Sequence, residues 1–132
     1  MDNRKSLRIP DDFAYIIRAG GANLRPSEFK VSYAISIGGV LSIALITHTQ
    51  CGMVNLDDRK ERFVQGLVDR AGWEKTAAEE HFANFAPVSE IGDEVSFACS
   101  EAGRLARLYP GVQVVPLLYK VEDDLLYLLQ QC

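Results

Sequence analysis

Short apolar runs alternate with amphipathic stretches along the chain. The apolar runs are short enough for single strands and predict strands over residues 13–17, 40–47, 112–118 and 125–129. Between them, apolar residues recur every three or four positions, which predicts helices over 26–37, 57–72, 74–86 and 93–109. Glycine or proline stands at most of the junctions, where such residues end helices and strands.

Strands that alternate with helices predict an α/β fold with a mostly parallel sheet flanked by helices. The run over 125–129 follows the acidic turn Glu122-Asp123-Asp124, and we expect it to return as an antiparallel edge strand. The chain has 132 residues, which suits one domain over 1–132 with a real core and does not suit two.

Composition narrows the possible partners. The net charge of −4 argues against a surface for nucleic acid or for an anionic membrane. The apolar runs are far shorter than the roughly 20 residues that a transmembrane helix needs, and residues 1–10 do not resemble a signal peptide. Cys51, Cys99 and Cys132 make an odd count without a disulfide-like spacing, which favours a reducing, cytoplasmic setting.

The segment 43–53 carries the most chemical information. A predicted strand, which we expect at the centre of the sheet, runs into His48. Cys51 follows three residues later, and Gly52 comes directly after it. In open α/β sheets, ligands bind at the carboxyl ends of the strands. Imidazole and thiolate are preferred ligands of zinc. The alternative is a histidine that caps a strand end and a buried structural cysteine, and the pair alone does not decide between the two.

Three motifs in this order resemble the β-class carbonic anhydrases. Met1-Asp2-Asn3-Arg4 matches the end of the family's C-x-D-x-R motif, and Arg18-Ala19-Gly20-Gly21 is similar to its R-N-A-G-G strand end. His48-Thr49-Gln50-Cys51-Gly52 matches H-T-x-C-G. The tail from Tyr109-Pro110-Gly111-Val112 into the next strand also fits, so the resemblance extends from Met1 to about Tyr119.

The resemblance implies a three-layer Rossmann-like domain and a zinc enzyme that hydrates carbon dioxide reversibly to bicarbonate. His48 and Cys51 would bind Zn²⁺, and a zinc-bound hydroxide would attack the substrate. Asp2 and Arg4 would form the family's catalytic dyad, in which the arginine orients the aspartate beside the metal-bound water. Backbone at three glycines would approach the substrate: Gly20, Gly21 and Gly52. Family members pair through edge strands, which implies a homodimer or a larger homo-oligomer.

The sequence also departs from the family pattern. The family's first zinc-ligand cysteine stands immediately before the position of Met1, so the usual N-terminal helix and first strand would be lacking. We therefore expect either a truncated form of a longer chain or a rearranged sheet. The interval from Arg4 to Arg18 is short, and Gln50 replaces the aspartate of many relatives. Two alternatives stay open: hydrolysis of carbonyl sulfide or carbon disulfide at the same zinc, and a catalytically inactive binding module.

Overall fold

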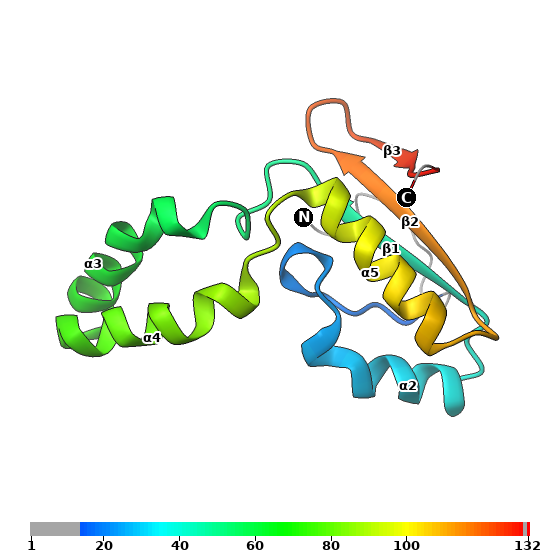
Figure 1. The fold of residues 1–132 in the computed structure, drawn as a ribbon, viewed down its shortest axis with the longest axis horizontal. Helices are drawn as coiled ribbons and strands as arrows, with labels where there is room; N and C mark the ends of the chain where they lie inside the picture. Colours follow the sequence, from blue (N-terminus) through cyan, green and yellow to red (C-terminus); the bar gives the residue numbers. More distant parts are fainter. Residues whose placement is uncertain (1–13, 131) are drawn as a thin grey trace.

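A small sheet forms one part of the fold. In this computed structural model, which describes residues 14–130 and 132, its strands are β1 (Ser42–His48), β2 (Gln113–Lys120) and β3 (Leu125–Leu128). The sheet has the order β1-β2-β3, with β1 and β2 parallel and β2 and β3 antiparallel (Figure 1). The predicted α/β class is confirmed, as is the antiparallel return of the last strand.

Helices connect the strands where the apolar spacing predicts them. They are η1 (Gly20–Ala22), η2 (Arg25–Ser27), α2 (Glu28–Ser36), η3 (Leu56–Arg59), α3 (Lys60–Ala71), α4 (Lys75–Ser89) and α5 (Glu94–Leu108). The end predicted for α4 is wrong, because the helix continues through Pro87 into its last turn. Within the described part of the chain, no helix has the length and apolar character needed to cross a membrane.

The core forms where α2 and α5 pack against the sheet. Leu45 of β1, Val31 of α2 and Leu105 of α5 belong to one buried cluster, together with Leu24 and Ala102. Leu105 has no exposed surface. Burial of a side chain of this size contributes about 1.5–3 kcal/mol, so this cluster fixes the position of β1, and with it the position of His48.

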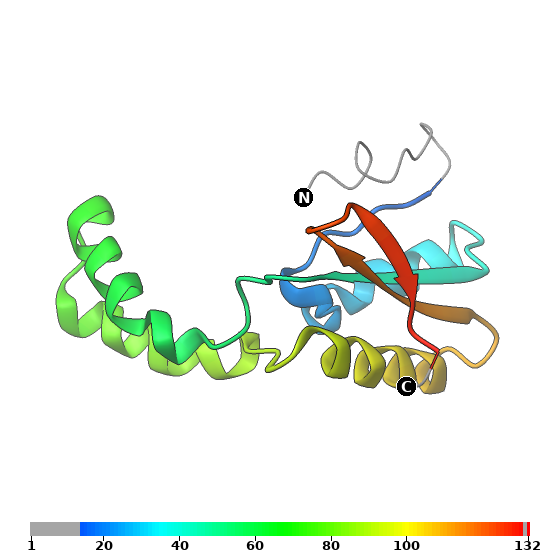
Figure 2. The same ribbon diagram turned by 90° about the horizontal axis from the view of Figure 1, so that it is seen from above.

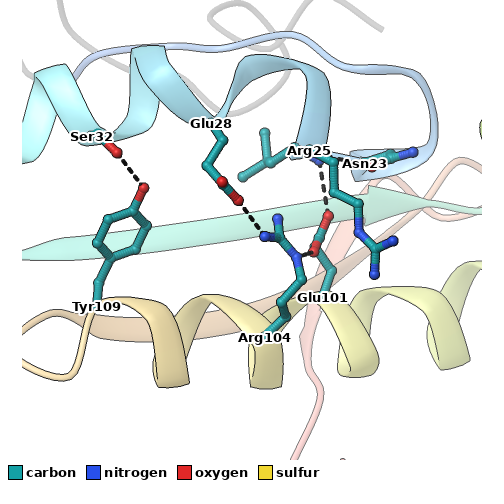
Figure 3. A network of polar contacts seen from close by, with 8 residues as sticks. Asn23, Arg25, Glu28, Ser32, Glu101, Arg104 and Tyr109 are labelled. Carbon is teal, nitrogen blue, oxygen red and sulfur yellow. Dashed lines mark hydrogen bonds and ion pairs between the residues drawn. The ribbon is translucent and has the colours of Figure 1, made fainter.

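A polar network joins the segment before α2 to α5 (Figure 3). The buried Glu101 carboxylate accepts a hydrogen bond from the backbone N–H of Leu24 at 3.0 Å and pairs with Arg104. Arg104 also pairs with Glu28 of α2. These carboxylates, Glu101 first, raise the pKa of the Arg104 guanidinium above its ordinary value. The network therefore keeps a buried charge paired and ties the two helices together.

The hairpin of α3 and α4 extends away from the sheet (Figure 2). Its two helices pack on each other through an aromatic cluster of Phe63, Trp73, His81, Phe82 and Phe85. The ring of His81 lies 5.0 Å from that of Phe85, centroid to centroid. His81 is therefore a packing residue of this hairpin.

Two expectations about the N-terminal half of the sheet are not met. Residues 14–17 form no strand, although 13–17 was predicted as one. We also expected His48 at the end of a central strand, but β1 is an edge strand of the sheet that the described residues form. Apolar character alone does not make a strand, because a strand also needs a neighbour for its backbone hydrogen bonds.

The interpretation of the cysteines needs a correction. Cys99 of α5 and Cys132 form a disulfide, with Cα atoms 4.9 Å apart. Cys51 is the free, buried thiol. The pairing depends on β3, which brings the end of the chain back towards α5 and closes a sequence separation of 33 residues. The cysteine count therefore no longer argues for a reducing setting, because disulfides persist in oxidising ones.

Candidate metal centre

His48 is the last residue of β1, so the core that fixes this strand also fixes the imidazole. Its Nδ1 lies 2.8 Å from the backbone carbonyl oxygen of Thr49. A hydrogen bond from Nδ1–H to that carbonyl leaves the lone pair of Nε2 free for a metal. Histidines that bind metals usually donate their other ring N–H to a carbonyl or a carboxylate in this way. The surroundings of His48 thus fit a zinc ligand.

Cys51 follows in a tight loop. Gln50 has a φ of 57°, in the left-handed region that few residues other than glycine adopt. The Cys51 side chain is 5% exposed, and its thiol takes part in no disulfide. Its backbone N–H donates to Glu94 Oε1 at 3.0 Å, from the first turn of α5. A buried free thiol beside the end of β1 supplies the second donor type that zinc prefers.

Glu122 holds the other side of this loop. Its Oε2 accepts a hydrogen bond from the Thr49 hydroxyl at 3.0 Å, and its Oε1 accepts one from Gln50 Nε2 at 3.0 Å. The Thr49 hydroxyl oxygen accepts in turn from the backbone N–H of Val121 at 3.0 Å. Hydrogen bonds from its own backbone N–H, from Thr49 and from Gln50 hold the pKa of the Glu122 carboxyl below its ordinary value. The turn between β2 and β3 thus holds the loop after His48 in place through hydrogen bonds to Thr49 and Gln50.

A pocket of about 290 Å³ lies beside Cys51. Its lining includes Gln50, Cys51, Asp58, Arg59 and Glu94. The Arg59 guanidinium donates a hydrogen bond to the Gly52 carbonyl. The pocket therefore carries both signs of charge next to the thiol, and it is large enough for a small molecule and several waters.

The glycines proposed for substrate binding lie near the same loop. A Cβ on Gly20 would lie 3.2 Å from Met53 Cγ, and one on Gly21 would lie 2.6 Å from Ile91 Cγ2. Ile91 in turn donates its backbone N–H to the Met53 carbonyl at 3.1 Å. η1 therefore packs against the segment that follows Cys51. Close packing explains these glycines directly, and a contact with substrate stays a prediction.

Two donors do not complete a zinc site. The residues that the structure describes contain no group of three histidine, cysteine or acidic side chains placed to hold one metal ion. Asp2 and Arg4 lie outside the described residues. Sequence reasoning missed Glu94 and Glu122, since an acidic residue in a turn or at a helix start is ordinary in any chain. Only the fold reveals that both contact the loop between His48 and Cys51.

Known structures share this fold. No protein-family model and no curated protein sequence matches the chain. A carbonic anhydrase from Glaciozyma antarctica superposes with a TM-score of 0.73 at 21% identity, over 97% of this chain and 74% of that one. A carbonic anhydrase from Streptococcus mutans gives a TM-score of 0.69 at 14% identity, over 98% and 75%. The β-carbonic anhydrase CcaA gives 0.55 at 14%, over 98% and 74%. The chain therefore has the fold of these carbonic anhydrases, as the sequence resemblance implied.

Proposed function

We propose that the chain belongs to a zinc-dependent β-class carbonic anhydrase, which interconverts carbon dioxide and bicarbonate. One observation carries the proposal: β1 ends in His48, whose Nδ1 is engaged by a carbonyl, and the buried free thiol of Cys51 follows in the next turn. The fold shared with carbonic anhydrases supports it. The Asp2 and Arg4 motif and the H-T-x-C-G motif add sequence support.

Each protein group has a distinct role in this proposal. His48 Nε2 and the Cys51 thiolate would hold Zn²⁺, which when bound lowers the pKa of a coordinated water to about 7 and so supplies a nucleophile at neutral pH. Asp2, fixed by Arg4, would orient that water or serve as a further ligand. The backbone N–H of Gly52, next to the thiolate, would bind a substrate oxygen, and Gly20 and Gly21 would line the approach.

Assembly as a homodimer is part of the same proposal. Apolar side chains on and after α2 are exposed, with Phe29 at 81% and Leu41 at 78%, and Tyr33 and Ile37 lie on the same stretch. Several large apolar side chains exposed on one short stretch of chain are typical of interfaces between subunits. Light scattering at micromolar concentration should report a dimer or a larger species, and a monomer would contradict this part. A cytoplasmic location stays a prediction.

Substitutions in the loop test the metal chemistry. Cys51→Ser and His48→Ala should each remove zinc binding and any hydration of carbon dioxide, measured by metal analysis and by stopped-flow pH change. The matched controls are His81→Gln and the double variant Cys99→Ser/Cys132→Ser, which change the same residue types outside the loop. Zinc and activity that survive Cys51→Ser would refute the proposal, whereas a parent chain without hydration activity even when zinc is bound would favour the inactive binding module.

A third ligand can be tested by extension. Catalytic zinc usually has three protein ligands, and the family pattern has a cysteine directly before the position of Met1. The 132-residue chain should bind zinc weakly and turn over little. A chain extended by an apolar strand that ends in cysteine should hold about one zinc, in line with that ligand count. In it, Asp2→Asn should keep zinc and lose most of the rate. Stoichiometric zinc and rapid turnover without the extension would reveal a ligand outside this scheme.

A further inference from the structure

The segment between the two proposed ligands is held by two acidic residues from distant parts of the chain. Glu94 lies in the first turn of α5, and Glu122 lies in the turn between β2 and β3. Glu94 accepts from the Cys51 backbone N–H, while Glu122 accepts from Thr49 and Gln50. All three hydrogen bonds measure 3.0 Å. The two carboxylates therefore engage every residue from Thr49 to Cys51.

The loop needs this support because its backbone is not in a relaxed conformation. Gln50 has a φ of 57°, in the left-handed region that strains a residue with a side chain. Without its partners, Gln50 would relax to negative φ, which would redirect the Cys51 N–H and its side chain. Hydrogen bonds to charged acceptors are stronger than those to neutral ones, and those to Glu94 and Glu122 hold the loop against this strain.

We propose that Glu94 and Glu122 are positioning residues of the metal loop, which orient Cys51 relative to His48 by binding Thr49, Gln50 and the Cys51 amide. This inference rests on the proposed function where it concerns zinc. The orientation of Cys51 in the metal-free protein is independent of it. Neither carboxylate is offered as a metal ligand, since each is occupied by donors of the loop. Partners of this kind typically change metal affinity 10–100-fold when removed.

Glu94 and Glu122 differ in which side chain can replace them without loss of their hydrogen bonds to the loop. Glu94 accepts a single hydrogen bond from the loop, so glutamine can replace it with its amide oxygen. Glu122 accepts from two donors through two oxygens, and glutamine has only one acceptor oxygen. We therefore expect Glu94→Gln to orient Cys51 as the parent chain does. Glu94→Ala, Glu122→Gln and Glu122→Ala should each lose this orientation.

The experiment measures two properties of the full chain. The first is the rate at which an aromatic disulfide reagent labels Cys51 without metal, a selective readout because the other two cysteines are paired. The second is zinc affinity, by competition with a chromophoric chelator, with the thiolate-to-metal band of the Co²⁺ form as its spectroscopic signature. Glu94→Ala and Glu122→Ala should raise the labelling rate about tenfold and weaken zinc about tenfold. Two controls should change neither: Asp124→Asn in the same turn and Glu80→Gln on α4.

Each outcome decides the matter. Parent rates and affinity in folded Glu94→Ala and Glu122→Ala would overturn the inference, as would a failure of Glu94→Gln to restore the parent values. Zinc affinity that His48→Ala and Cys51→Ser leave unchanged, with labelling of Cys51 accelerated in the glutamate-to-alanine variants, would refute the proposed function and leave the positioning role intact. If Glu94→Ala does not fold, Thr49→Val removes the Glu122 hydrogen bond from the loop side, and unchanged labelling in it would count against the inference.

Discussion

Gly21 offers the most quantitative prediction, because two separate effects act at one position. Its φ is 65°, so any side chain there is strained by about 1–2 kcal/mol. A Cβ would also lie 2.6 Å from Ile91 Cγ2 and 2.9 Å from Ile91 Cδ1, distances that require Ile91 to move. Ile91 is buried, and overpacking of a buried site costs about 1–3 kcal/mol. Gly21→Ala should therefore destabilise the fold by about 2–5 kcal/mol.

Gly39 separates the two effects. Its φ is 71°, but a Cβ there would meet no atom within 4 Å, so Gly39→Ala should show the backbone strain alone, about 1–2 kcal/mol. Urea unfolding followed by circular dichroism measures both variants against the parent chain. Equal losses in Gly21→Ala and Gly39→Ala would refute the packing of η1 against Ile91. A larger loss in Gly21→Ala would support it, and would explain this glycine without substrate.

Three further substitutions test the fold around the site. Leu105→Ala removes a fully buried side chain and should cost about 2–5 kcal/mol in urea unfolding, whereas Leu108→Ala on the exposed side of α5 should cost much less. Arg104→Leu leaves the buried Glu101 without its cation, a change that costs about 3–5 kcal/mol of stability at a fully buried pair. The loss should be smaller here because Arg104 is partly exposed, and an unchanged stability would show that the pair does not form. Asp93→Ala removes the N-cap of α5 and should cost about 1 kcal/mol at pH 7. The Ser96 hydrogen bonds lower the pKa of Asp93. The stability that Asp93 contributes is therefore present above the ordinary pKa of about 3.9 and is lost as the pH falls below it. At such low pH, the parent chain and Asp93→Ala should have the same stability.

The order of strands and helices could be predicted from the sequence because local patterns determine it. β1, β2 and β3 each coincide closely with an apolar run, and α5 follows the stripe that carries Leu105. The sequence could not show that residues 14–17 form no strand, because strand pairing depends on a neighbouring strand and not on the residues themselves. The same reason applies to the edge position of β1.

In the candidate site, too, local features could be predicted from the sequence and long-range contacts could not. His48 and Cys51 could be identified from residue type, spacing and their place after an apolar run. Glu94 and Glu122 could not, because their contacts with this loop span 43 and 73 residues of sequence. The Cys99–Cys132 disulfide was missed for a related reason, since only the return of β3 brings the chain end to α5. The spacing of apolar residues along the chain therefore does not predict contacts between side chains that lie far apart in the sequence.

X-ray absorption at the zinc edge tests the central claim most directly, because it identifies the atoms bound to the metal. The full chain, loaded with one equivalent of zinc at a concentration far above its dissociation constant, should show a nitrogen ligand at about 2.0–2.1 Å and a sulfur ligand at about 2.3 Å. The sulfur should disappear in Cys51→Ser and persist in the Cys99→Ser/Cys132→Ser variant. A parent spectrum with only oxygen and nitrogen ligands, or a sulfur that survives Cys51→Ser, would contradict the assignment of His48 and Cys51 as the ligands of one zinc ion.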